Sequence, residues 1–287
     1  MSIGAFALVV VGALLHAYWN VQMKRARAGV GFIWLFTLIA VAFLAPAGVY
    51  RLIETGSWGD TRTLLAAAAS AIVHVVYHNA LQLGYRHGDF STVYPVARGV
   101  APLMTVVGAA LLLSESVPFT NWVGAGAIAT GIVLLSVKRG DGASPGHKGV
   151  GWAILTGISI TTYTLIDAWA VVELHADPLA YYFVSQVFRA ILFAPAALAV
   201  FDSFREAVRD SRREALIIGI LSPAAFLMIL FAMQLAPVSQ VAPLREISML
   251  FGALAGGMHF GERFGRARLA GIVSIAVGAV LVTLREP

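Results

Sequence analysis

The chain has 287 residues, of which 59% are hydrophobic and only 12% are charged, and its formal net charge is +5. A soluble domain carries about 25% charged residues, so the composition excludes an ordinary water-soluble protein and predicts a polytopic membrane protein. The absence of cysteine excludes disulfides, thiolate metal sites and cysteine nucleophiles. The positive charge fits the loops of a membrane protein, so no nucleic-acid partner is expected.

Ten apolar windows of roughly 20 residues follow one another, each long enough to cross a bilayer as a helix. They lack the period-2 alternation of barrel strands, and the loops between them are short, the longest polar stretch being residues 202–215. The first window has no basic start and no clear cleavage site, so it is interpreted as a retained span and not as a signal peptide. The expected fold is an all-α membrane protein with ten transmembrane helices. The windows are 3–23, 32–53, 63–84, 90–112, 120–138, 150–172, 178–201, 215–236, 239–260 and 267–284.

Lysine and arginine are divided unevenly between the two sets of loops. The loops that follow odd-numbered windows carry fourteen of the 20 basic residues, whereas the opposite side carries Arg51, Arg62 and Arg285. Because basic loops tend to stay in the cytoplasm, we expect a bacterial-type inner membrane with both termini on the non-cytoplasmic side.

The two halves of the sequence resemble each other at an offset near 147 residues. Each half holds five windows, so the halves must insert in opposite orientations, as inverted repeats at 1–147 and 148–287 within one integral membrane unit. Inverted repeats with helix breakers at matching positions are typical of secondary transporters whose site lies near the bilayer midplane, between the halves. The matching pairs are Asn20 with Asp167, Ser91 with Ser239, Pro95 with Pro243, Glu115 with Glu262, Gly124 with Gly271, and Gly131 with Gly278.

Three segments carry a resemblance to a known family: HAYWN at 16–20, VYPVARGVAPL at 93–103 and VAPLREIS at 241–248. Together with Glu115 and Glu262 before the closing helix of each half, they make the whole chain resemble the ten-helix EamA-type exporters of the drug/metabolite transporter superfamily. Within that group it is similar to the aromatic amino acid exporters. The resemblance implies an inner-membrane carrier that exports amino acids or other metabolites without hydrolysing ATP.

Charged residues inside the windows are the sharpest signal, because a charge at the centre of a span costs about 2.5–3.5 kcal/mol and usually faces a cavity or a partner. Arg245 and Asp167 have similar predicted depths, so we expect them to pair or to share a polar network. Arg98 has no acidic residue at its depth, and Asn20 is its expected neutral partner. Alternatively, these charges form packing networks that hold the helices together. The charged residues of the predicted site are Arg98, Asp167, Arg189, Arg245 and Glu246.

Counted over the windows, three arginines oppose two carboxylates. The surplus positive charge favours a ligand with a carboxylate or phosphate group, unless Glu246 is protonated. Pro95, Pro102 and Pro243 are expected to break or kink the fourth and ninth helices, and Gly99 to permit close approach or bending. We assign these four residues to gating, with kinks that serve only packing as the alternative.

Aromatic and polar side chains recur on single helix faces at spacings of three and four residues. Such rings suit stacking on an aromatic or apolar substrate, or alternatively belong to interfacial aromatic belts. His74 and His78 have the spacing of a helical zinc pair, but a third ligand is missing, so no metal is expected. The predicted substrate-binding set adds His16, Trp19, Asn20, His74, Tyr77, His78, Tyr94, Tyr163 and Ser248 to the charged residues.

These features favour a secondary active transporter that exports small metabolites by alternating access, with amino acids as the first candidates and protons as a candidate coupling ion. No cofactor is expected, because the glycine-containing stretch at 142–149 lacks the spacing of a phosphate loop. An exporter of cationic or hydrophobic drugs is the alternative. A channel, a scaffold and a membrane-embedded enzyme are alternatives of other classes, but an enzyme would need a nucleophile with a base, or a metal, clustered at one depth.

Overall fold

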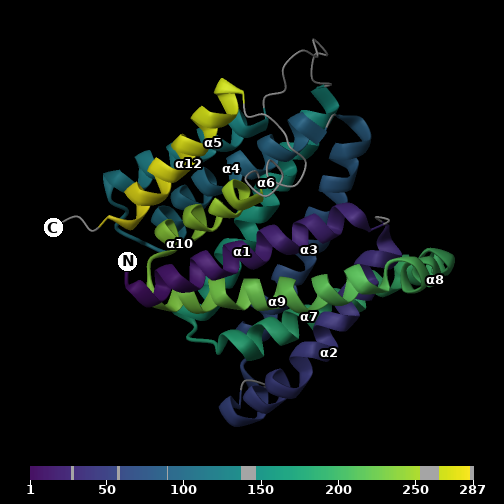
Figure 1. The fold of residues 1–287 in the computed structure, drawn as a ribbon. Coiled ribbons are helices and arrows are strands. Elements are labelled where there is room, and N and C mark those ends of the chain that lie inside the picture. The colour runs from purple at the N-terminus through teal and green to yellow at the C-terminus, as the bar shows by residue number, and fades with distance from the viewer. Residues whose placement is uncertain (27–28, 57–58, 89, 137–146, 253–264, 285–287) are drawn as a thin grey trace. The chain divides into compact units, whose positions relative to one another are not determined.

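The computed structural model describes residues 1–26, 29–56, 59–88, 90–136, 147–252 and 265–284, and nearly all of them are helical (Figure 1). Eight helices in these ranges are long and apolar enough to cross a bilayer. A spanning helix needs about 20 residues because each residue rises 1.5 Å. The prediction of an all-α, multi-pass membrane protein is therefore confirmed.

The helices follow the predicted windows in order, with ends that differ by a few residues. Window 150–172 is divided in two, since an α-helix passes into one turn of π-helix at its end. The elements are α1 (Ile3–Arg25), α2 (Val30–Thr55), α3 (Thr61–His87), α4 (Phe90–Leu112), α5 (Phe119–Ser136), α6 (His147–Ala168), the π-helix η2 (Trp169–Glu173), α7 (Pro178–Ala199), α8 (Phe201–Asp210), α9 (Arg212–Leu235), α10 (Val238–Arg245) and α12 (Arg266–Thr283).

Two of the ten predicted spans are not established. The apolar part of α5, Phe119–Leu135, is shorter than the other spans. In the ninth window α10 ends at Arg245, and residues 253–264 lie outside the described residues. The ten-helix count and the inverted repeat consequently remain predictions.

The polar stretch 202–215 was expected to be a loop, and this is wrong. Most of it forms α8, which is joined to α7 by Val200 alone and to α9 by Ser211 alone. Its apolar residues recur every three or four positions, so one face of the helix packs while the other stays polar. A loop was predicted because only apolar length was considered, and amphipathic periodicity was not.

The chain folds into two compact units made of discontinuous segments. Unit 1 comprises Met1–Phe6, Val76–Leu165 and Leu235–Pro287, and unit 2 comprises Ala7–Val75 and Ile166–Gln234. Each unit thus draws helices from both halves of the sequence. The division into repeats at 1–147 and 148–287 concerns sequence similarity, and it stays a prediction.

In unit 1, α5 and α12 pack backbone to backbone at two glycine pairs. A Cβ atom on Gly124 would lie 2.9 Å from the carbonyl oxygen of Gly278, and one on Gly131 would lie 2.7 Å from that of Gly271. The reversed order of the partners makes the two helices antiparallel. An offset of 147 residues relates Gly124 to Gly271 and Gly131 to Gly278, so it exchanges the two glycine pairs. Such an exchange is expected of a local two-fold axis that relates α5 to α12.

In unit 2, α2 packs along α7 with a side chain at the contact. Gly48 faces the ring of Phe183, because a Cβ atom there would lie 2.5 Å from the Phe183 Cγ. The indole nitrogen of Trp34 donates a 3.0 Å hydrogen bond to the carbonyl of Ala190. Both contacts fix α2 against the middle of α7.

Candidate functional site

The predicted site residues are divided between the two units. Arg245 and Asp167 belong to different units, so their expected pairing stays a prediction. Unit 1 contains Tyr77, His78, Tyr94, Pro95, Arg98, Gly99, Pro102, Tyr163, Pro243, Arg245, Glu246 and Ser248. Unit 2 contains His16, Trp19, Asn20, His74, Asp167 and Arg189.

The buried charges of unit 1 gather around Glu246, whose side chain is 1% exposed. Nη1 of Arg98 donates to Oε1 of Glu246 at 3.5 Å and lies 3.4 Å from Oε2. Nε of Arg245 lies 3.5 Å from Oε1. Direct charge-assisted hydrogen bonds measure about 2.7–2.9 Å, so both ion pairs are loose. Among the buried residues described in unit 1, these three are the charged ones, and they leave a surplus of one positive charge.

The prediction that Arg98 has no acidic neighbour is wrong. It assumed that depth can be counted along an uninterrupted ninth helix, whereas α10 ends at Arg245 and the chain turns at Glu246. A long arginine side chain can then reach a carboxylate that residue counting places at another depth. The expected alternative partner, Asn20, donates a 2.7 Å hydrogen bond to the carbonyl of His16 within α1.

Aromatic rings from three helices occur in the same unit. The guanidinium carbon of Arg98 lies 5.8 Å from the ring centre of Tyr94, one turn earlier on α4. Tyr77 makes edge contacts with His78 at 4.8 Å and with Tyr163 of α6 at 6.0 Å. Unit 1 therefore brings together the predicted aromatic residues of α3, α4 and α6.

The N-terminus of α10 is held by a carboxylate from another part of the unit. The Glu115 side chain accepts hydrogen bonds from the backbone N–H groups of Val238 at 2.6 Å and Ser239 at 3.0 Å. Asn121 also donates to the Ser239 hydroxyl at 3.3 Å. A carboxylate stabilises a helix N-terminus by satisfying free N–H groups and by opposing the helix dipole. The sequence places Glu115 just before α5, whereas the helix start that its side chain holds is that of α10.

The predicted gating residues differ in what they do to the helices. α4 runs through Pro95 and Pro102 as one helix, so neither proline breaks it. α10, by contrast, ends two residues after Pro243. The predicted close approach at Gly99 is wrong, since a Cβ atom there would meet the Ala129 carbonyl oxygen at 3.6 Å, an ordinary contact. A gating role for these residues stays a prediction.

The buried charges of unit 2 have aromatic partners. Oδ1 of Asp167 accepts a 2.6 Å hydrogen bond from the hydroxyl of Tyr181. The guanidinium carbon of Arg189 lies 5.3 Å from the ring centre of Tyr182, and that ring stacks on Phe226 at 4.8 Å. These contacts join α7 to α9 and to the end of α6.

The remaining predicted residues of unit 2 are packed within it. Nδ1 of His74 lies 2.8 Å from the carbonyl of Ser70, one turn earlier on α3, and its ring meets Phe226 edge-on. His16 and Trp19 are 4.7 Å apart. Trp19 also packs against the hydrophobic cluster that includes Ala207 of α8, as expected of a structural tryptophan.

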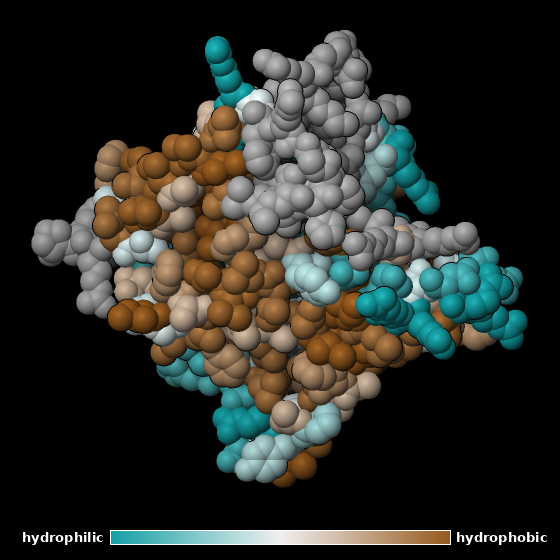
Figure 2. Space-filling model, viewed as in Figure 1, coloured by the Kyte–Doolittle hydropathy of each residue, from teal (hydrophilic) through white to brown (hydrophobic). Residues whose placement is uncertain are grey.

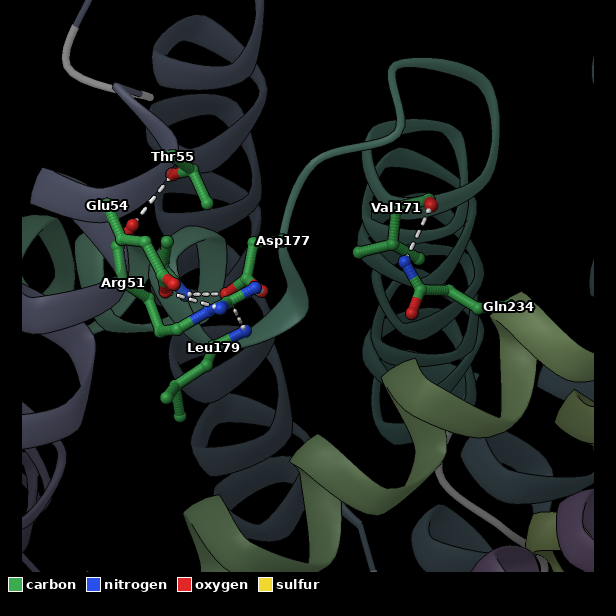
Figure 3. A network of polar contacts seen from close by, with 8 residues as sticks. Arg51, Glu54, Thr55, Val171, Asp177, Leu179 and Gln234 are labelled. Atoms are coloured by element: carbon green, nitrogen blue, oxygen red, sulfur yellow. Dashed lines mark hydrogen bonds and ion pairs between the residues drawn. The ribbon is translucent and has the colours of Figure 1, made fainter.

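A polar cavity of about 560 Å³ in unit 2 contains none of the predicted site residues. Arg51 at the end of α2 contacts Oδ2 of Asp177 through Nε at 3.0 Å and Nη2 at 2.6 Å, and Glu54 through Nη1 at 2.6 Å (Figure 3). The cavity is lined by Arg51, Thr55, Gly56, Asp60, Thr63, Leu174, His175, Ala176, Asp177, Pro178, Phe231 and Gln234.

Both aspartates of this cavity hold helix starts. Asp177 accepts from the N–H groups of Leu179 and Ala180 at the start of α7. Asp60 accepts from the N–H of Arg62 at the start of α3 and from the hydroxyl of Thr63. The Thr63 hydrogen bond is the main reason why the pKa of Asp60 lies below its usual value.

The π-helix η2 lies beside the same cavity. Its wider turn leaves the Val171 carbonyl to accept a 3.3 Å hydrogen bond from the side chain of Gln234 (Figure 3). Single π-turns inside α-helices occur frequently at functional sites. This one begins two residues after Asp167.

Comparison with known proteins gives a family domain and a fold. Residues 147–284, a little under half of the chain, match the EamA-like transporter family. The chain contains an EamA-like transporter domain. This domain and the eight apolar helices support a multi-pass membrane protein whose second half is similar to EamA-like transporters. The comparisons give no support to the narrower likeness to aromatic amino acid exporters.

The fold of the chain also occurs in a solved structure described only as the crystal structure of a protein. That structure aligns with a TM-score of 0.75 over 99% of this chain and 97% of its own chain. Its sequence identity is 17%, so the likeness concerns the fold alone. No curated protein matches the chain.

Sequence reasoning missed Tyr181, Arg51 and Asp177. Asp-Pro at 177–178 is a recognisable helix start, because aspartate is favoured at the N-cap and proline at the first helical position. Arg51 was counted as a loop charge, since it lies near the end of its window. No spacing in the sequence links Tyr181 to Asp167, because the η2 turn and the following loop set their proximity.

Proposed function

We propose that this transporter is a secondary active carrier that exports small metabolites bearing a carboxylate, amino acids in particular, by alternating access. The EamA-like domain supports the carrier class. The loose cluster of Arg98, Arg245 and Glu246 in unit 1 carries the proposal for the substrate, because two buried guanidiniums face one carboxylate at 3.4–3.5 Å.

The cluster suggests how a substrate exchanges with an internal ligand. Guanidinium groups bind carboxylates through paired N–H donors, with strong geometric preference. A substrate carboxylate can therefore replace Glu246 at Arg98 and Arg245. If Glu246 takes up a proton when it is displaced, the proton and the substrate occupy the carrier together and cross the membrane in the same direction. The aromatic side chains Tyr77 and Tyr94 then contact the remainder of the substrate.

Proteoliposomes that contain the full chain test the substrate class and the coupling together. Labelled amino acids and their decarboxylated amine analogues should be compared, each with and without a pH gradient. We expect transport of the amino acids, accelerated by the gradient, and little transport of the amines. Faster transport of the amines would contradict the proposal and favour an exporter of cationic drugs.

Replacement of the central arginine tests the site itself. Arg98→Ala is expected to abolish transport while the protein stays folded, because Arg245 still faces Glu246. Losing a charged partner of a bound carboxylate costs about 2–5 kcal/mol, which corresponds to a loss of roughly 30-fold or more in affinity. Arg62→Ala, at an exposed position on α3, is the control. Unchanged transport by Arg98→Ala would remove Arg98 from the site.

A further inference from the structure

The short helix α8 is held at the membrane boundary by its neighbours. α7 and α9 are both long and apolar enough to span the bilayer, and single residues, Val200 and Ser211, join them to α8. A helix of 10 residues is about 15 Å long, and such short links cannot carry it away from the ends of the two spans. α8 must therefore lie near the headgroup layer.

One face of α8 is fixed against the protein. Phe204 lies 5.0 Å from the ring of Trp34 on α2, and Ala207 is buried. Gly31 allows this contact, because a Cβ atom there would lie 2.6 Å from the backbone carbon of Ser203. α8 is consequently docked on the start of α2, and its remaining faces are available to its surroundings.

Around the axis of α8, the exposed side chains form an apolar, a basic and an acidic sector. At about 100° per residue, Phe201 and Val208 fall within about 20° of each other, next to the docked face. Both are exposed, at 40% and 42%. Arg205 and Arg209 come next, at about 40° and 80° from Phe201, and the guanidinium carbon of Arg205 lies 5.1 Å from the centre of the Phe201 ring.

The acidic residues of α8, Asp202, Glu206 and Asp210, occupy the side farthest from Phe201, at about 100–180°. Asp210 forms an ion pair with Arg209 at 2.7 Å, and Arg212 and Arg213 follow at the start of α9. The order apolar, basic, acidic is that of helices that lie in a membrane interface, with arginines at headgroup level. Figure 2 shows hydrophilic residues gathered over α8, beside the mostly hydrophobic surface of the spans.

We propose that α8 is an interfacial helix that binds anionic phospholipid headgroups through Arg205, since Arg209 is paired with Asp210, with Phe201 and Val208 inserted among the acyl chains. The arginines lie between the apolar edge and the acidic face, at the depth where lipid phosphates occur. Each arginine near an anionic surface contributes about 1 kcal/mol, which is roughly fivefold in lipid preference.

The chain has no cysteine, so single cysteines can be labelled with bimane in the full-length protein. The Val208→Cys and Glu206→Cys proteins are placed in vesicles of phosphatidylcholine and phosphatidylglycerol. Bimane fluorescence is then measured with a nitroxide quencher attached to the headgroup of one lipid or of the other. We expect strong quenching at 208, weak quenching at 206, and up to roughly fivefold preference for phosphatidylglycerol at 208. The preference should fall in Arg205→Gln, and in about 1 M salt, where the Debye length is about 3 Å.

Ile53→Cys provides a matched control. It is 70% exposed near the far end of α2, where the neighbouring Arg51 already pairs with Asp177 and Glu54. Equal quenching at 206 and 208 would overturn the proposed orientation. A preference for phosphatidylglycerol that is the same at 208 and 53 would overturn the lipid binding. Quenching requires no transported substrate, so neither result depends on the function proposed above.

Discussion

The two units hold their buried charges in different ways. In unit 2, Asp167 accepts a 2.6 Å hydrogen bond from Tyr181 and Arg189 lies over the Tyr182 ring, so one positive and one negative charge each have a close aromatic partner. In unit 1, Glu246 is approached by two arginines at 3.4–3.5 Å, with one positive charge in surplus. A short hydrogen bond to Asp167 and a formally neutral set of charges suit a structural role, whereas loose ion pairs with surplus charge suit the exchange of ligands.

The largest effect is expected from removing the single carboxylate of the unit 1 cluster. Glu246→Gln leaves Arg98 and Arg245 buried without an anion, which costs about 3–5 kcal/mol. Transport should be lost, and thermal unfolding of the detergent-solubilised protein should occur at a lower temperature. Glu54→Gln removes the same charge from a side chain that is 46% exposed, and it should change stability by no more than about 1 kcal/mol. Equal effects of the two variants would contradict a special role for the cluster.

Next in size is the glycine contact between α5 and α12. A Cβ atom in Gly131→Ala meets backbone atoms, the Gly271 carbonyl oxygen at 2.7 Å and the Ile275 nitrogen at 2.9 Å. Backbone cannot move aside as a side chain can, so we expect a loss of about 1–3 kcal/mol. Gly99→Ala has only ordinary contacts and should be neutral or stabilising by about 0.5–1 kcal/mol. Thermal unfolding of both variants measures the difference, and a stable Gly131→Ala variant would exclude the close contact.

The sequence was sufficient where a signal is local and periodic. Apolar length located the spans, and the repeated glycines that pack α5 on α12 were visible as the matches of Gly124 with Gly271 and Gly131 with Gly278. The sequence was insufficient where a helix end or a turn determines which side chains meet. The end of α10 at Arg245 brings Glu246 to Arg98, and the π-turn after Asp167 precedes the chain reversal that brings in Tyr181. Depth counted by residue number cannot anticipate either change.

Tyr181→Phe tests the tight contact of unit 2. The substitution keeps the ring but removes the hydroxyl that donates to Asp167, and hydrogen bonds to charged groups contribute about 1.5–3 kcal/mol. We expect a corresponding loss of thermal stability, with transport retained in the folded fraction. Tyr50→Phe, at a 62% exposed position, is the matched control and should have no effect. Loss of transport without loss of stability would move Asp167 from a structural to a functional role.

A smaller effect is expected at the cavity of unit 2. Asp177→Ala removes the N-cap of α7, which costs about 0.5–2 kcal/mol, and also the ion pair with Arg51. Asp177→Asn keeps a capping oxygen but puts an NH2 group in place of the oxygen that accepts from Arg51, so it loses the ion pair and its hydrogen bonds. Since the Arg51 side chain is 38% exposed, that ion pair contributes at most about 1 kcal/mol. The unfolding temperature should therefore be highest for the wild type, slightly lower for Asp177→Asn and lowest for Asp177→Ala. If Asn is as unstable as Ala, the ion pair and not the cap holds α7.

The smallest effect concerns pH at the same cavity. The pKa of Asp60 is lowered, mainly by the hydrogen bond from Thr63, so the folded state favours the charged carboxylate more than the unfolded state does. Its contribution to stability is present above the unfolded pKa of about 3.9 and is lost as the pH falls through the lower folded pKa. Thr63→Val should bring the folded pKa closer to the unfolded value and so flatten the acid side of the stability profile. Thermal unfolding from about pH 5 down to about pH 2.5 would measure this. Parallel profiles for the wild type and the variant would show that Thr63 does not set the pKa of Asp60.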